Sequence, residues 1–182
     1  MWESRNLTPA TVRGARWTGV QLITADAYEG LAAARRAVFG GMPVQRCQFH
    51  LHQNAQAYVP RHELKPQVAA DIHALFNAPT RAEAERLLNQ TVEKYQPIAS
   101  RLASWLEEAI PQGLTVVSFP EAHRRRLCTA DMLERINQEL RRRTRVVGIF
   151  PNPASCLRLV SAHLMELDKE WLAGRTYLTF QD

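Results

Sequence analysis

One carboxylate stands where it could bind a divalent metal ion. Asp26 directly follows residues 20–25, an apolar and β-branched run that is typical of a buried strand. An acidic side chain at the carboxyl end of a parallel strand lies at the sheet edge where ligands gather, and carboxylate oxygens are the ligands that Mg²⁺ prefers. The alternative is that Asp26 only caps the helix that follows. Its position therefore raises two interpretations, a metal ligand and a helix cap.

A second carboxylate, Glu134, lies in a predicted helix over 131–144, where it shares a polar face with Asn137 and the later arginines. Leu133, Ile136 and Leu140 are expected to face the core of the protein. The alternative is a capping box, in which Asp131 and Glu134 bind the first amides of the helix. The functional interpretation of Glu134 rests on this polar face, which would be unusual for contact with solvent alone.

Cys47 and His50, with His52 just beyond, have the spacing of half a zinc site. A structural zinc ion needs four ligands, and the other cysteines, Cys128 and Cys156, each stand alone far along the chain. We therefore expect no zinc, and prefer a cysteine and histidine that fix the end of a strand.

Arginine is unevenly distributed. The chain has 20 Arg and only 3 Lys, a total that codon usage in a GC-rich genome would explain. Clustering is more telling, because eight arginines lie within 22 residues, and consecutive arginines repel one another on an ordinary solvated helix face. Guanidinium groups bind phosphate bidentately, so this cluster favours a nucleic acid as partner over a solvated surface. Its members are Arg124, Arg125, Arg126, Arg135, Arg141, Arg142, Arg143 and Arg145.

Composition excludes several classes of protein. With 182 residues, 46% hydrophobic and 23% charged, and a formal net charge of +5, the chain can bury a core and is not disordered as a whole. Three cysteines do not make a disulfide scaffold. There is no apolar run long enough for a transmembrane helix and no apolar signal core at the first residues. We expect no membrane partner and a reduced, cytoplasmic protein.

Two strands and a helix must position Asp26. The run 20–25, an Ala-rich helix over 27–39 and a second strand over 44–49 make a strand-helix-strand unit, whose two strands are predicted to be parallel. Gly40, Gly41 and Pro43 end the helix between them.

The remaining chain is expected to be helical. Pro-marked helices fill 51–120, one of them opened by a capping box of Thr80 and Glu83. Another is expected to bury Ile98, Leu102, Trp105 and Leu106. The last helix should begin at Pro153 after an Asn152 N-cap. Its predicted core-facing stripe comprises Leu157, Val160, Leu164, Leu167 and Trp171.

These motifs together resemble the Mutator-type transposases of bacterial insertion sequences. The middle of that family is similar to 24–31 (TADAYEGL) and 45–50 (QRCQFH) with Asn54, and its C-terminal signature is similar to 123–127 (HRRRL), 133–137 (LERIN), 141–145 (RRRTR) and Phe150-Pro151. The resemblance covers essentially the whole chain in family order. Asp131 and Ala130 depart from it, because the family usually has Asn and Thr at these two positions.

The resemblance implies a ribonuclease H-like fold with an Asp, Asp, Glu triad that binds two divalent metals, Mg²⁺ or Mn²⁺. Asp26 matches the second Asp, Glu134 matches the Glu, and Cys47, His50 and Asn137 match signature positions. The implied activity is DNA cleavage and strand transfer on transposon ends and target DNA. No Asp precedes Asp26, so the first catalytic position is absent from this sequence. We therefore expect the C-terminal part of a transposase that is inactive by itself.

The predicted fold class is α/β and helix-dominated: a partial ribonuclease H-like sheet with an all-α insertion and C-terminal helices. The predicted segments are 1–50 for the strand-helix-strand unit, 51–120 for the insertion, and 121–182 for the helices that carry Glu134 and the arginine cluster. Two alternatives remain open, a catalytically dead DNA-binding remnant and a helical protein-interaction module. Possible partners besides DNA are a second copy of the chain and an intact transposase.

Overall fold

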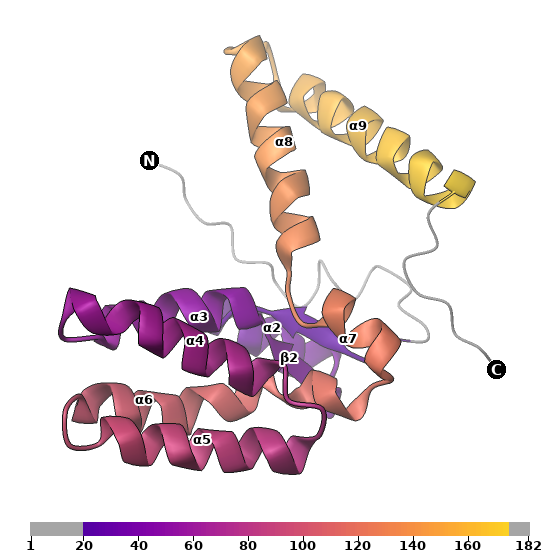
Figure 1. The fold of residues 1–182 in the computed structure, drawn as a ribbon. Coiled ribbons are helices and arrows are strands. Elements are labelled where there is room, and N and C mark those ends of the chain that lie inside the picture. Colours follow the sequence, from indigo (N-terminus) through magenta and orange to yellow (C-terminus); the bar gives the residue numbers. More distant parts are fainter. Residues whose placement is uncertain (1–19, 175–182) are drawn as a thin grey trace. The chain divides into compact units, whose positions relative to one another are not determined.

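Residues 20–174 are described by the computed structural model (Figure 1). The chain forms two compact units, with the boundary between Ala130 and Asp131, and each is described by itself. The first contains a small sheet and most of the helices, and the second contains α8 and α9. The architecture is helix-dominated with a two-stranded parallel sheet, which confirms this much of the predicted fold class.

The sheet pairs β1 (Ile23–Ala25) with β2 (Val44–Arg46), in the register Ile23 to Val44 and Ala25 to Arg46. Helix α2 (Glu29–Val38) connects them, so the predicted strand-helix-strand unit is confirmed. Gly41 has a φ of 84° in the turn after α2, a conformation that glycine adopts without strain. Both strands are shorter than predicted. After Cys47 the chain leaves the ladder, because the Gln48 amide donates to the Cys128 carbonyl and a new helix begins.

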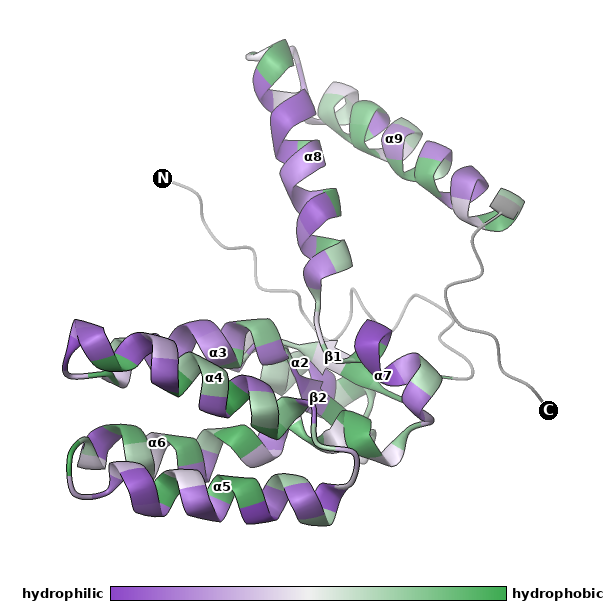
Figure 2. Ribbon diagram, in the orientation of Figure 1, coloured by the Kyte–Doolittle hydropathy of each residue, from purple (hydrophilic) through white to green (hydrophobic). Residues whose placement is uncertain are grey.

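The rest of the first unit is built from helices whose apolar sides meet. Hydrophobic and hydrophilic residues alternate along each of them, as the amphipathic pattern predicts (Figure 2). Two 3₁₀ segments, Ile110–Gly113 and Thr115–Ser118, then lead to the last helix of this unit. The helices are α3 (Gln48–Ala55), α4 (Lys65–Phe76), α5 (Arg81–Tyr95), α6 (Ser100–Ala109) and α7 (Glu121–Leu127).

Most of the predicted stripe of α6 is buried. Leu102 and Leu106 are fully buried, and Trp105 is half-buried with its ring stacked on Tyr58 at 5.3 Å between centroids. The prediction for Ile98 is wrong, because this side chain is 56% exposed. Ile98 lies in the turn before α6 begins, so the spacing of the helix does not apply to it.

Helices α4 and α5 are joined by polar contacts as well as by apolar packing. The Asp71 carboxylate accepts hydrogen bonds from Lys94 Nζ at 2.6 Å, Tyr95 Oη at 2.7 Å and Gln67 Nε2 at 3.0 Å. Desolvation raises the pKa of Asp71, but these hydrogen bonds outweigh it and the net pKa is lowered. At the start of α5 the Glu83 amide donates to Thr80 Oγ1 at 3.2 Å, which confirms the Thr80 half of the predicted capping box. The Glu83 carboxylate instead accepts from Arg86.

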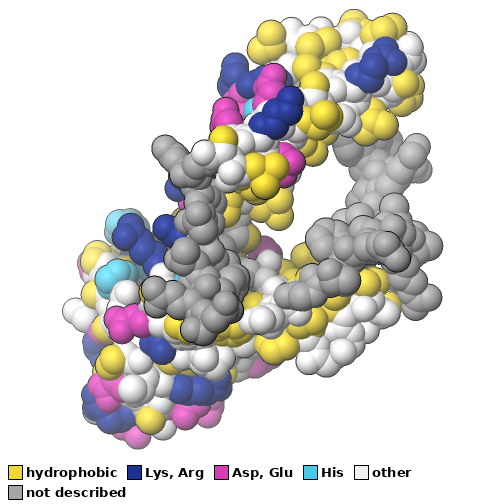
Figure 3. All heavy atoms as spheres, turned by 90° about the vertical axis from the view of Figure 1, so that its right-hand side faces the viewer, with side chains coloured by type: hydrophobic (Ala, Val, Ile, Leu, Met, Phe, Trp, Pro, Cys, Tyr) yellow, Lys and Arg dark blue, Asp and Glu magenta, His cyan; other side chains and the backbone are white. Residues whose placement is uncertain are grey.

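In the second unit, α8 (Asp131–Val147) is followed by α9 (Pro153–Gly174). Asn152 caps α9 as predicted, since its Oδ1 accepts from the Ser155 amide at 2.9 Å. The predicted core-facing residues of both helices are partly wrong: Leu133 is exposed, and so are Leu157, Leu164 and Trp171 of α9. The space-filling view shows hydrophobic side chains on the surface of this unit, in the upper part of Figure 3. Among the described side chains of α9, His163 is buried instead, at 6% exposure.

Candidate metal site and nucleic-acid interface

Asp26 lies at the carboxyl end of β1, as predicted. Its Oδ1 accepts from the Ala27 amide at 2.8 Å, and its side chain is 47% exposed. The N-cap of α2 is Tyr28, which makes no side-chain cap, so Asp26 does not cap this helix and that alternative is wrong. An accessible carboxylate at a strand end has the hard oxygen donors that a divalent cation requires.

His50 is the histidine beside this carboxylate. It lies in the first turn of α3, and its Nδ1 is 3.9 Å from Asp26 Oδ2. The two residues come together because both strands end at the same edge, where the Cys47 amide donates to the Ala25 carbonyl at 2.9 Å. The parallel pairing thus brings the two sequence motifs to one site.

Cys47 has a structural position. It is fully buried, and its Sγ accepts from the Ala130 amide at 3.4 Å. The end of α7 is bonded to the sheet in two further places: Thr24 Oγ1 donates to the Leu127 carbonyl at 2.7 Å, and the Gln48 amide donates to the Cys128 carbonyl at 2.9 Å. Burial raises the pKa of the Cys128 thiol. These contacts fix the segment that precedes α8.

Glu134 lies in the first turn of α8. Asp131 begins this helix instead of preceding it, and its carboxylate accepts from Arg135 at 2.5 Å. Asp26 and Glu134 belong to different units, so their shared role in a metal site stays a prediction. Asn137 is exposed on α8, and its side chain makes no hydrogen bond to another residue in the described range.

Among the α7 arginines, Arg124 is held by the protein itself. Its Nε donates to the Phe119 carbonyl and one of its terminal nitrogens donates to the Pro79 carbonyl, both at 2.8 Å. This guanidinium therefore fastens α7 to the loop between α4 and α5. Arg125 and Arg126 are exposed on the same helix.

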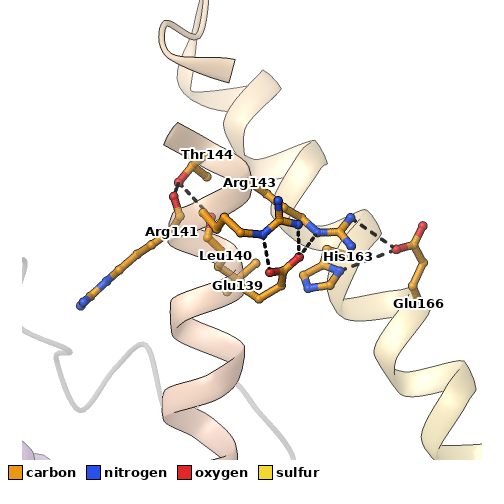
Figure 4. Close-up of polar contacts among 8 residues, drawn as sticks. Glu139, Leu140, Arg141, Arg143, Thr144, His163 and Glu166 are labelled. Carbon is orange, nitrogen blue, oxygen red and sulfur yellow. Dashed lines mark hydrogen bonds and ion pairs between the residues drawn. The ribbon is translucent and has the colours of Figure 1, made fainter. Parts of the chain in front are cut away.

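On α8, Glu139 binds two of the arginines. Its carboxylate accepts from Arg142 at 2.7 Å and from Arg143 at 2.8 Å, and these hydrogen bonds lower its pKa to about 2. Arg143 also lies 3.8 Å from Glu166 of α9, whose carboxylate is 3.6 Å from His163 Nδ1 (Figure 4). These arginines have part of their charge neutralised within the unit.

Arg141 and Arg145 differ from their neighbours. The Arg141 side chain extends away from the Glu139 group in Figure 4. Neither arginine forms an ion pair with a described carboxylate, and together with Gln138 they line an open hollow of about 530 Å³ on one face of α8. Four residues on a helix span about 6 Å, so the two charges can meet neighbouring phosphates.

Three further arginines were not predicted from the sequence as functional residues. Arg35, Arg36 and Arg46 line an open hollow of about 430 Å³ together with Asp26 and Glu29. The only signal in the sequence was the Arg35-Arg36 pair in the last turn of the helix that follows Asp26. Arg46 lies far from that pair along the chain and reaches it only through the pairing of β2 with β1.

The comparison with known families matches residues 5–174 to the family described as "Transposase, Mutator family". The chain belongs to the Mutator family of transposases. Similar proteins include the transposase for insertion sequence element IS406 of Burkholderia multivorans, 60% identical over 162 residues. The transposase for ISRM5 of Rhizobium meliloti is 37% identical over 171 residues, and that for IS256 in transposon Tn4001 of Staphylococcus aureus is 32% identical over 165 residues.

This Mutator-family chain spans about two fifths of the length of those relatives. The matched regions cover 89%, 94% and 89% of this chain, but 42%, 43% and 42% of the three relatives in turn. In the part that the structure describes, no helix has the length and apolar character needed to span a bilayer.

Proposed function

We propose that this chain takes part in DNA transposition, in which a protein of the Mutator family cuts DNA and transfers the strand with the help of divalent metal ions. The match to Mutator transposases over residues 5–174 carries this proposal. The two parallel strands, the first of which ends just before Asp26, support a ribonuclease H-like sheet. Cytoplasmic DNA, as transposon end and target, is the proposed partner.

Asp26 and Glu134 are the residues that would hold Mg²⁺ or Mn²⁺. The Asp26 carboxylate fits this role, because it is accessible, accepts a hydrogen bond from the next amide alone among residues 20–174, and is adjacent to an imidazole. Two metal ions would activate the attacking hydroxyl and stabilise the leaving oxygen. The chain's own contribution is to hold the carboxylates and the DNA backbone in place.

Arginines that are not neutralised within the protein would bind the DNA backbone. Arg141 and Arg145 suit this best, since they share one face of α8 and lack carboxylate partners in the described part. Arg124 is engaged with carbonyl groups, and Arg142 and Arg143 share Glu139. DNA affinity should therefore depend unequally on the eight clustered arginines.

A salt titration of DNA binding tests this interface. For Arg141→Ala with Arg145→Ala, we expect weaker binding to duplexes of any sequence and a slope of log affinity against log salt that is smaller by about 0.9 per lost contact. Arg61→Ala with Arg101→Ala removes the same charge from exposed positions elsewhere and should leave the slope unchanged. Equal losses in the two variants would show that net charge alone drives binding.

A cleavage assay tests the catalytic part of the proposal. We expect the 182-residue chain to bind DNA without cutting it. None of its residues before Asp26 is an Asp that could match the first Asp of the family's triad, so the metal ions would be under-coordinated. Mg²⁺- or Mn²⁺-dependent cleavage that is lost in Asp26→Asn would contradict this, and would show that another carboxylate or a second copy completes the site.

The exposed hydrophobic residues of α9 favour a second candidate, a helical interaction module that binds a second copy or an intact transposase. Light scattering over a range of concentrations distinguishes the two, since a module of this kind would associate without DNA. Replacing Leu157 and Leu164 with Gln should then reduce the association.

A further inference from the structure

The hollow beside Asp26 contains three arginines that the proposed DNA interface does not use. Arg35 and Arg36 come from the last turn of α2, and Arg46 ends β2. Arg46 pairs in register with Ala25, the residue immediately before Asp26. The three guanidinium groups are therefore gathered around the strand end that carries the candidate metal ligand.

None of these arginines has a side-chain partner within residues 20–174. Both Asp26 and Glu29 line the same hollow, yet neither forms an ion pair with Arg35, Arg36 or Arg46. The Nε of Arg46 is buried and donates no hydrogen bond to a described group. A buried donor without an acceptor is costly, so the described residues do not satisfy the hydrogen-bonding capacity of this guanidinium.

Charge and size indicate the chemistry of that ligand. The lining carries three positive and two negative groups, and like-charged guanidiniums that share a hollow repel one another until an anion lies between them. A volume of about 430 Å³ accommodates a phosphate group with part of its sugar. Guanidinium forks match phosphate oxygens in geometry.

We propose that Arg35, Arg36 and Arg46 form a phosphate-binding site that holds the backbone of a DNA strand next to Asp26. The site rests on the proposed function, because it takes the ligand to be transposition DNA. None of its three arginines belongs to the cluster on α7 and α8. Its role is positioning: a phosphate fixed here places the adjacent phosphodiester beside the Asp26 carboxylate.

Fluorescence anisotropy with a labelled DNA strand and a labelled duplex, in the absence of divalent metal, tests the site. Arg35→Gln with Arg36→Gln should weaken binding about tenfold at low salt and reduce the salt slope by about 0.7 per contact for the single strand. The control, Arg61→Gln with Arg101→Gln, removes two exposed arginines outside the hollow and should change affinity much less. If circular dichroism shows that the double variant is unfolded, the single variant Arg36→Gln replaces it in the binding assay, because Arg36 is exposed.

Asp26→Asn distinguishes a local effect of the phosphate site from an effect of net charge on DNA affinity. Removing this carboxylate should tighten DNA binding, because the bound phosphate no longer faces a like charge, and the gain should vanish in the Arg35→Gln, Arg36→Gln background. Glu107→Gln, on the exposed side of α6, is the matched control and should have no such coupling.

Two outcomes would overturn the inference in distinguishable ways. If the wild-type chain binds neither the single strand nor the duplex, both the proposed function and the phosphate site are refuted. Wild-type binding that loses affinity in the Arg141→Ala, Arg145→Ala variant but not in the Arg35→Gln, Arg36→Gln variant would refute the phosphate site alone.

Discussion

Gln45 joins the sheet to the 3₁₀ segments that follow α6, and its replacement should destabilise both. The side chain is fully buried in β2. Its Nε2 donates to the Gly113 carbonyl at 2.7 Å and to the Arg46 carbonyl at 2.8 Å, and its Oε1 accepts from the Val116 amide at 2.8 Å. A strand residue thus satisfies the backbone of the 3₁₀ segments some 70 positions later.

The cost of Gln45→Leu follows from the groups that it leaves behind. The Val116 amide would be buried without an acceptor, at about 1–3 kcal/mol of unfolding free energy. The Gly113 carbonyl would keep a donor, because Gln48 Nε2 also binds it at 2.8 Å. Gln48→Leu alone should therefore cost only about 1 kcal/mol, the net value of one hydrogen bond.

The double variant makes the reasoning sharper. Removing both glutamines leaves the Gly113 carbonyl with neither donor, so the loss should exceed the sum of the single losses by about 1 kcal/mol. Urea unfolding followed by circular dichroism measures all three variants. Strictly additive losses, or a Gln45→Leu protein as stable as the wild type, would refute the assignment of these hydrogen bonds as the connection between the sheet and the 3₁₀ segments.

Three further predictions concern single side chains. Trp105→Ala should lower the free energy of unfolding by about 2–4 kcal/mol, below the range for a fully buried Trp, since its stacked ring is only half-buried; thermal unfolding measures it. Asp71→Asn should flatten the loss of stability in acid: because the folded pKa of Asp71 is lowered, its contribution is full above its unfolded pKa of about 4 and is lost as the pH falls through the folded value. A pH series of urea midpoints tests this, and an unchanged acid limb would contradict it. The Glu139 carboxyl should titrate near its pKa of about 2 by NMR, and this pKa should rise toward the ordinary range in Arg142→Ala. An unchanged pKa in that variant would contradict the prediction.

Several features could be predicted because they depend on neighbours along the chain. The caps at Thr80 and Asn152 are set by hydrogen bonds within one helical turn. The parallel strands and the strand-end position of Asp26 follow from the length of the connecting helix and the handedness of such units. Family membership rests on short motifs in order along the chain, so the resemblance was sufficient to identify it.

What the sequence could not determine depends on contacts between distant residues. Nothing local shows that Arg124 binds the carbonyl groups of Pro79 and Phe119, or that Arg46 meets Arg35 in one hollow. Helical spacing likewise identifies an apolar stripe but not what covers it, so Leu157 and Leu164 of α9 were wrongly predicted to be buried. The sequence by itself determined the residue types, the helices and the end of the first strand. The tertiary structure decided which charges remain available to a ligand, because neutralisation and burial depend on groups brought together by folding.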